Sequence, residues 1–283
     1  MATKRYHLTK KELEYLKGKK IGLLLSGGAS HGYAEIGAMK ILEEYNIVPD
    51  YIVGVSVGSL VGTAVASGVS MRVIEEYFLG LKPLSLVDLS LRGLGFIKGE
   101  KIVSKVLGVL EVKRFGQLKI PLAVTATNVN SANQRVFDKG LLSPALHASI
   151  AVPGLFAPTK IGSQYYVDGG VYTPLPFSPF PKHIEVLIIV DVSLRHSKID
   201  EQSSVIQVFR NSIMIMTRRM ALHKLEKIQQ EKDVIYVKPP VANINILDIR
   251  KRTAMQMLRL GEYTMRKELK LQVRRLLRAQ QRR

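Results

Sequence analysis

Short apolar runs alternate with longer segments of helical spacing at the start of the chain. Ile21–Leu25 and Tyr51–Val55 are apolar runs of the kind found in strands that are buried on both faces. Each run leads through small residues into a segment with apolar positions at helical spacing, over residues 32–45 and 56–67. Two strand–turn–helix units in succession predict a parallel sheet covered by helices.

The remaining pattern predicts the other elements of an α/β domain. Strands are expected at Pro121–Thr127, Gln134–Phe137, Tyr165–Val167, Ile184–Val190 and Asp233–Val237, and helices near 9–16, 100–110, 143–150, 203–230 and 247–281. Thr9 and Glu12 have capping-box spacing at the first helix. We find no repeat or interdomain linker. The expected organisation is a basic helical extension over 1–20, one α/β domain over 21–246, and a basic helix over 247–283 that packs on the domain or extends from it.

Charge is distributed unevenly along the 283 residues, whose net charge is +19. Residues 1–20 carry +5 and residues 250–283 carry +10, so the body between them is nearly neutral. A basic surface suits either nucleic acid or an anionic membrane. The basic ends lack interleaved aromatic residues and match no nucleic-acid reader motif. We therefore expect peripheral contact with an anionic membrane through the termini, and no specific nucleic-acid partner.

Composition excludes several kinds of chemistry. The chain has no cysteine, which removes disulfides, thiolate metal sites and a cysteine nucleophile. It also contains no H-E-x-x-H and no G-x-x-x-x-G-K-[ST], so we expect no catalytic metal and no cofactor. The charged start has no apolar signal region, and no apolar run is long enough to span a bilayer. A cytoplasmic location, with membrane association, is the expectation.

Three short motifs could carry catalysis. Gly54-Val55-Ser56-Val57-Gly58 fits the G-x-S-x-G nucleophile elbow, with a predicted strand before it and a helix after it. Ser26-Gly27-Gly28-Ala29-Ser30 lies in a similar turn, where small residues let backbone N–H groups face an oxyanion. Asp168-Gly169-Gly170 could close on another backbone and bring a carboxylate to Ser56 as a proton acceptor.

These motifs, in this order, resemble the patatin-like phospholipase family. The resemblance covers residues 20–192 and includes the segments 148–158 and 173–176. It implies a central, mostly parallel sheet flanked by helices, the patatin-like three-layer sandwich, with a helical C-terminus. It also implies a serine acyl hydrolase that cleaves lipid or fatty-acyl esters through an acyl-enzyme. In that scheme Ser56 is the nucleophile, Asp168 completes a Ser–Asp dyad, and Gly27, Gly28 and Ala29 form the oxyanion hole.

Two residues depart from the family pattern G-G-G-x-[RK]-G. Ala29 stands where the third glycine is usual, and it can donate its N–H to an oxyanion if its φ is negative. His31 stands where a basic residue is usual, and it mimics that charge only in part, because a histidine is often uncharged near neutral pH. These departures affect the expected rate and substrate preference more than the reaction class.

Other interpretations stay open at this point. An α/β-hydrolase triad could pair Asp168 with His183 or His196, or Asp191 with His196. A catalytically weak protein that binds lipid or nucleic acid is a further alternative. The irregular stretch 82–117 is expected to form a lid or acyl-binding wall.

Two helices near the C-terminus raise separate expectations. Met214, Met216 and Met220 are expected to fill the core. The last helix carries an apolar stripe flanked by arginine and lysine, which suits either a docked helix or adhesion to anionic lipid. The stripe comprises Leu258, Met265, Leu269, Val273 and Leu276.

Overall fold

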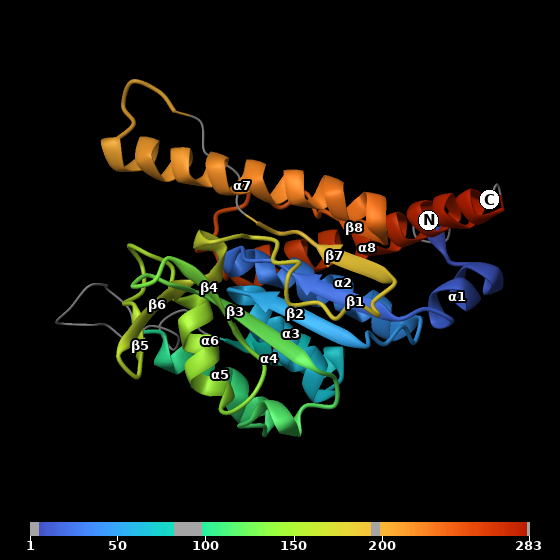
Figure 1. Ribbon diagram of the computed structural model, residues 1–283, viewed down its shortest axis with the longest axis horizontal. Helices are drawn as coiled ribbons and strands as arrows, with labels where there is room; N and C mark the ends of the chain where they lie inside the picture. Colours follow the sequence, from blue (N-terminus) through green and yellow to red (C-terminus); the bar gives the residue numbers. More distant parts are fainter. Residues whose placement is uncertain (1–5, 82–97, 194–198, 282–283) are drawn as a thin grey trace.

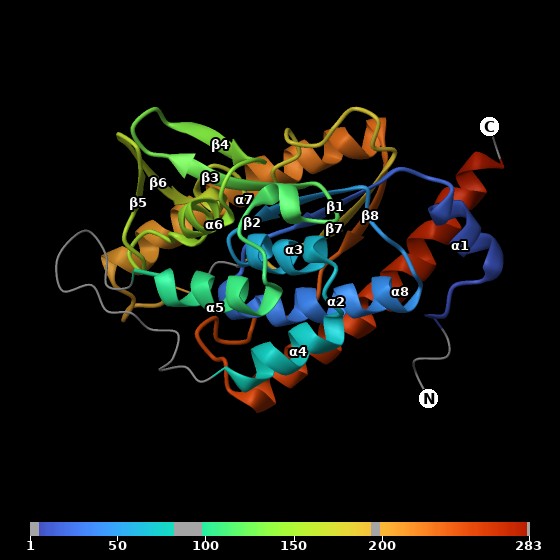
Figure 2. The ribbon, with the colours of Figure 1, turned by 90° about the horizontal axis from the view of Figure 1, so that it is seen from below.

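The computed structural model describes residues 6–81, 98–193 and 199–281. They form a mixed sheet with helices on both faces (Figures 1 and 2), in the strand order β5-β6-β3-β2-β1-β7-β8, with β4 paired to β3. The strands are β1 (Ile21–Leu25), β2 (Tyr51–Val55), β3 (Leu122–Asn128), β4 (Asn133–Phe137), β5 (Thr159–Ile161), β6 (Gln164–Asp168), β7 (Val186–Val190) and β8 (Asp233–Val237). The run from β3 to β8 is parallel, which confirms the predicted mostly parallel sheet.

The helices follow the predicted pattern closely, with additions. They are α1 (Lys10–Lys17), α2 (Gly32–Glu44), α3 (Val57–Ser67), α4 (Met71–Gly80), α5 (Glu100–Leu110), α6 (Leu142–Ile150), α7 (Val205–Glu231) and α8 (Lys251–Gln280), with 3-10 turns η2 (Ala29–His31), η4 (Phe115–Gln117) and η5 (Gly169–Val171). Thr9 caps α1 through the predicted capping box. The sequence did not predict α4 or β5. Residues 82–97 of the expected lid lie outside the described residues, and the rest of it contains α5 and η4.

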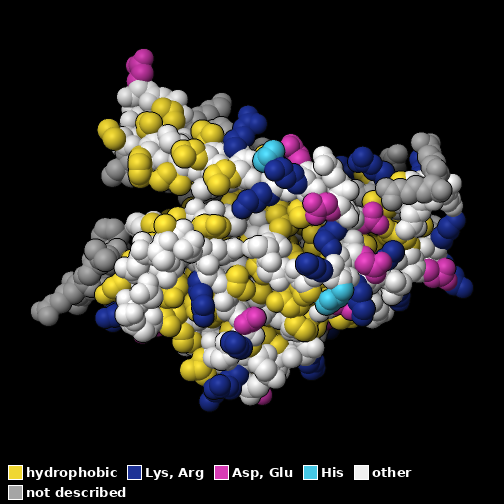
Figure 3. Space-filling view, in the orientation of Figure 1, with side chains coloured by type: hydrophobic (Ala, Val, Ile, Leu, Met, Phe, Trp, Pro, Cys, Tyr) yellow, Lys and Arg dark blue, Asp and Glu magenta, His cyan; other side chains and the backbone are white. Residues whose placement is uncertain are grey.

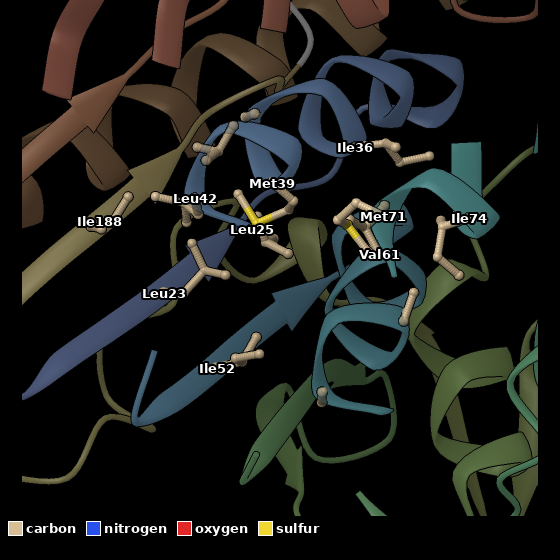
Figure 4. Close-up of a cluster of buried hydrophobic side chains, with 14 of the residues drawn as sticks. Leu23, Leu25, Ile36, Met39, Leu42, Ile52, Val61, Met71, Ile74 and Ile188 are labelled. Atoms are coloured by element: carbon tan, nitrogen blue, oxygen red, sulfur yellow. The ribbon is translucent and has the colours of Figure 1, made fainter. Parts of the chain in front are cut away.

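Alternate side chains of the central strands enter two different cores. Leu23 and Leu25 of β1 face the large cluster beneath α2 and α3, whereas Leu24 faces a smaller cluster under α7. Figure 4 shows the larger cluster, in which Ile52 of β2 and Ile188 of β7, on either side of β1, join side chains from α2, α3 and α4. Because both faces are buried, these strands read as continuous apolar runs instead of alternating ones.

Helix α8 packs directly against α2 through glycines. A Cβ on Gly261 would lie 1.9 Å from the carbonyl oxygen of Ala34, and one on Gly37 would lie 2.1 Å from that of Leu258. The predicted apolar stripe of the last helix is used for this packing: Leu258, Met265, Leu269 and Val273 are buried, and Leu276 is partly buried. Of the two interpretations of the stripe, packing of the last helix against the domain is therefore the one that the structure shows.

Basic residues of α8 pair with carboxylates of the N-terminal helices. Lys270 is buried and lies 2.6 Å from Glu12 of α1, and Arg274 lies 3.3 Å from the same side chain. Arg266 makes a 2.5 Å ion pair with Glu44 of α2. Part of the terminal basic charge thus serves the contacts among α1, α2 and α8.

Helix α7 is anchored over only part of its length. Ala221 and Leu225 are buried under it, beside β7 and β8. Met216 and Met220 are 64% and 55% exposed, so the expectation that they fill the core is wrong.

Among the helices that the structure describes, none combines the length and the apolar character that a membrane span requires.

Candidate functional site

The carboxyl end of β2 turns sharply into α3 at Ser56. This buried residue has φ 54° and ψ −130°, a conformation that is strained for a residue with a Cβ. Close approaches explain the flanking glycines. A Cβ on Gly54 would lie 2.6 Å from Ser59 Cα, and one on Gly58 would lie 2.4 Å from the carbonyl oxygen of Leu25. The turn has the geometry of the strand-to-helix elbow that G-x-S-x-G predicts.

Two buried serines hold the backbone of Ser56 in this conformation. Its N–H donates to Oγ of Ser149 on α6 at 2.9 Å, and its carbonyl accepts a 2.6 Å hydrogen bond from Oγ of Ser59. Ser149 lies in the 148–158 segment that resembles the family, but its contact was not predicted from the sequence. The contact joins residues 93 positions apart, which no local pattern reveals.

Sheet topology brings the carboxyl ends of β2 and β6 together. β3 pairs with β2 over 122–125 and with β6 over 126–128, while β4 occupies its opposite edge over 124–128. β2 and β6 therefore lie on the same side of β3. They run in opposite directions, because β2 is parallel and β6 antiparallel to β3. Their ends meet, which puts Asp168 beside Ser56.

Asp168 is buried at the end of β6 and is held by the turn that follows it. Its Oδ1 accepts a 2.7 Å hydrogen bond from the N–H of Gly170, and its carbonyl accepts a 2.9 Å hydrogen bond from the hydroxyl of Thr127. A Cβ on Gly169 would lie 2.5 Å from the carbonyl oxygen of Thr125. The Asp-Gly-Gly turn closes on the backbone of β3, so a glycine is needed there.

Burial raises the pKa of Asp168 from its ordinary value to about 6. The neighbouring Ser56 hydroxyl and the N–H of Gly170 act in the opposite direction and lower it. Oδ2 is buried and accepts no hydrogen bond of standard geometry from the described residues. The hydroxyl and the carboxyl are thus close but not fully aligned, and such contacts often tighten only when a substrate binds.

The predicted oxyanion loop passes beside Ser56. A Cβ on Gly27 would lie 2.8 Å from Ser56 Cβ, and one on Gly28 would lie 2.4 Å from the carbonyl oxygen of Val192. Within the described part of the chain, the N–H groups of Gly27 and Gly28 donate to no backbone carbonyl. Both glycines therefore allow close backbone contact, and among the described residues no backbone carbonyl accepts a hydrogen bond from their N–H groups.

The backbone conformation of Ala29 differs from the one expected of an oxyanion-hole donor. Its φ is 50°, in the left-handed region, whereas the expected N–H donor required a negative φ. This conformation costs a residue with a Cβ about 1–2 kcal/mol, and glycine adopts it freely. The departure from the family pattern therefore falls at a position where the backbone favours glycine.

His31 is buried behind this loop, and its ring contacts two other segments of the chain. Its Nδ1 lies 3.3 Å from the carbonyl oxygen of Val192, and its Nε2 lies 3.0 Å from that of Ile244. The N–H of Ser30 donates to the carbonyl of Ile246 at 3.1 Å. The histidine does not project a surface charge, as a basic side chain would, but ties the loop to the end of β7 and to the segment before α8.

The pKa values of two buried carboxyl groups behind the loop shift in opposite directions. Burial raises the pKa of Glu35, on the first turn of α2, well above its ordinary value. Asp191 is also buried, but Lys238 and Arg218 outweigh the effect of burial and lower its pKa to about 2. Arg218 lies 2.5 Å from Asp191, and Lys238 lies 3.1 Å from it. Sequence reasoning missed Glu35, whose one signal is a carboxyl group among apolar helix positions.

Among the described residues, no histidine completes the alternative triad. His183 lies before the amino end of β7, where its charge acts on Asp50, whereas Ser56 lies at the carboxyl edge of the sheet. His196 lies outside the described residues. The Asp191 carboxylate is engaged by cations. Over residues 6–81, 98–193 and 199–281, no group of three His, Cys, Asp or Glu side chains could hold a metal ion.

Comparison with known proteins identifies the family that the motifs resemble. The family model described as patatin-like phospholipase matches residues 23–181, which confirms the resemblance seen in the motifs. An uncharacterized NTE family protein of Mycobacterium tuberculosis is 33% identical over 187 residues, which cover 63% of this chain and 50% of that protein. Lysophospholipase NTE1 of Scheffersomyces stipitis is 26% identical over 266 residues, covering 83% of this chain and 17% of that enzyme. The chain spans about half the length of the mycobacterial relative, and less of the yeast one.

A solved structure shares the fold. The crystal structure of VipD from Legionella pneumophila superimposes with a TM-score of 0.61 at 14% identity, over 89% of this chain and 67% of VipD. At this identity the likeness concerns the fold alone. It agrees with the predicted helix-flanked sheet.

Proposed function

The chain belongs to the patatin-like phospholipase family, and on that premise we propose that it is a serine acyl hydrolase that cleaves carboxylic esters of lipids. The observation that best supports this proposal is that a strained, buried Ser56 lies beside a buried Asp168 whose pKa is raised to about 6. An activated hydroxyl needs a neighbouring group that accepts its proton, and Asp168 supplies one.

In the proposed reaction, Oγ of Ser56 bonds to the ester carbonyl carbon while Asp168 accepts the hydroxyl proton. The carbonyl electrons move onto the oxygen, where N–H groups of the loop at Gly27 and Gly28 stabilise the negative charge. The bond to the alcohol then breaks, and Asp168 returns the proton to the departing oxygen. Water attacks the acyl-Ser56 ester, gives a proton to Asp168, and releases the fatty acid as Oγ recovers that proton.

The raised pKa of Asp168 supports the role of base. With a pKa of about 6, the carboxyl is mostly ionised at pH 7 and is roughly a hundredfold more basic than an ordinary aspartate. The N-terminus of α3, which begins directly after Ser56, also favours negative charge near the elbow.

The proposed substrate class is phospholipid or lysophospholipid. Its support is the family together with the relative named lysophospholipase NTE1. A panel of lysophospholipids, diacyl phospholipids and simple fatty-acyl esters separates these classes by their kcat/KM values.

Serine-probe labelling and ester hydrolysis test the dyad. Ser56→Ala should lose both fluorophosphonate labelling and hydrolysis of a chromogenic fatty-acyl ester, and Asp168→Asn should lose hydrolysis. Ser104→Ala and Asp138→Asn change the same residue types at exposed positions and should keep full activity. Full activity in either dyad variant, with the fold intact by circular dichroism, would overturn the proposal.

A further inference from the structure

From Val205 to Met220, α7 presents a large apolar surface to solvent. Its exposed apolar side chains, each between 40% and 85% exposed, are Val205, Val208, Phe209, Ile213, Ile215, Met216 and Met220. Their exposed fractions add up to that of about four fully exposed side chains. Figure 3 shows hydrophobic side chains gathered on this part of α7, at the upper left. Surfaces of this size mark sites of interaction with a protein or a lipid. We call these seven residues the α7 face.

The α7 face is held at the same edge of the sheet as Ser56. Arg218 of α7 pairs with Asp191 just beyond the carboxyl end of β7. The ammonium group of Lys224 lies 5.8 Å from the ring centre of Tyr172, four residues after Asp168. These contacts hold α7 from Arg218 onward, and the end of the helix that begins at Val205 lies at the outer end of the molecule (Figure 1).

Along the helix itself, the charges beside the α7 face have one sign. From Val205 to Leu225 the sequence contains no aspartate or glutamate, whereas Arg219 and Lys224 are exposed there. Apolar side chains next to cations, with no carboxylate along this stretch of helix, complement the surface of an anionic phospholipid bilayer. The exposed carboxylates Asp200 and Glu201 lie before the helix begins. A second copy of the chain fits less well, because a two-fold contact through this face would bring its cations together with no carboxylate from the face to pair them.

We propose that the α7 face inserts into the headgroup region of an anionic phospholipid bilayer and holds the Ser56 edge of the sheet at the lipid surface. Its significance for catalysis rests on the proposed lipid acyl hydrolase function, whereas the binding itself does not. The proposal assigns membrane contact to α7, whereas the sequence suggested the basic termini. The apolar stripe of α8 is buried against the rest of the fold and is therefore not exposed to lipid.

The chain contains no tryptophan, so a single introduced indole reports insertion directly. Phe209→Trp and Met216→Trp should show a blue-shifted emission with vesicles of phosphatidylcholine and phosphatidylglycerol, and a smaller shift with phosphatidylcholine alone. Val48→Trp, at a position that is 66% exposed before β2, should show no shift. Equal shifts at all three positions, or none at any, would overturn the proposal.

Introducing negative charge on the α7 face gives an independent test. The double variant Phe209→Glu/Met216→Glu should lower partitioning onto the mixed vesicles at least tenfold, while hydrolysis of a short-chain water-soluble ester stays within twofold. The matched control, Val48→Glu/Val73→Glu, should bind vesicles like the unaltered chain. Unchanged vesicle binding by the α7 double variant, with native circular dichroism, would contradict the assignment. So would a dimer, seen by sedimentation, that only this variant dissociates.

Failure of the proposed function can be told apart from failure of this inference. Ser56→Ala should bind vesicles like the unaltered chain, because Ser56 lies outside the α7 face. If no ester is hydrolysed but the indole shift occurs, the α7 assignment stands and the hydrolase proposal falls.

Discussion

Replacing Asp168 by asparagine should stabilise the fold while it abolishes hydrolysis. The carboxyl is buried, so its negative charge lacks most of the solvation that it has in the unfolded chain. Asparagine has nearly the same shape and no charge. It therefore removes the cost of burying an ion and, with it, the proposed base.

The size of the effect follows from the shift in pKa. Burial raises the pKa of Asp168 from 3.8 to about 6, and a difference of about two units corresponds to about 3 kcal/mol. Above pH 6 the carboxyl is ionised in both the folded and the unfolded chain, so the folded state carries the full cost. Below about pH 4 it is protonated in both, and the cost vanishes. The wild-type chain thus loses this stability as the pH rises from about 4 to 6.

Urea unfolding followed by circular dichroism measures this directly. Asp168→Asn should have a free energy of unfolding about 3 kcal/mol higher than wild type at pH 7, and an advantage of only about 0.5 kcal/mol at pH 4. Asp138→Asn, at an exposed position, serves as the matched control and should change stability by less than about 0.5 kcal/mol. Lower stability of Asp168→Asn at pH 7, or a gain that does not depend on pH, would refute the reasoning.

Further predictions concern the site and the helix packing. The kcat/KM of the wild-type chain for a soluble ester should fall about tenfold between pH 7 and pH 5, as protonation removes the Asp168 carboxylate; a flat profile would contradict this. Ser149→Ala should lower kcat about tenfold with little change in KM, because the elbow N–H loses its acceptor; steady-state kinetics decide it. Ala29→Gly should raise the free energy of unfolding by about 0.5–1 kcal/mol in urea titrations by releasing the left-handed strain. Gly261→Ala should lower that free energy by about 3 kcal/mol, because its Cβ would meet a backbone oxygen at 1.9 Å, whereas Gly108→Ala on α5 has open space and should not.

Much of the fold could be predicted from local pattern. Strands such as Ile21–Leu25 are short apolar runs between polar or glycine-rich turns, and α1 is marked by its capping box. β5 was missed because it has only three residues and is stabilised by pairing with β6 across a tight turn. α7 was predicted as a helix, but its exposure was not, since the same apolar spacing describes a buried helix and an uncovered one.

For the site, the sequence by itself determined which residues could react. A serine between glycines after a strand, and an aspartate before two glycines, are chemical and conformational requirements that local sequence records. The tertiary structure decided what surrounds them. Only the pairing of β3 with both β2 and β6 brings Asp168 to Ser56, and only burial raises the pKa of that carboxyl to about 6. The left-handed φ of Ala29 and the clamp made by His31 depend on backbone contacts with distant segments. Electrostatic shifts and backbone strain arise from neighbours that folding brings together, so the linear order of residues does not contain them.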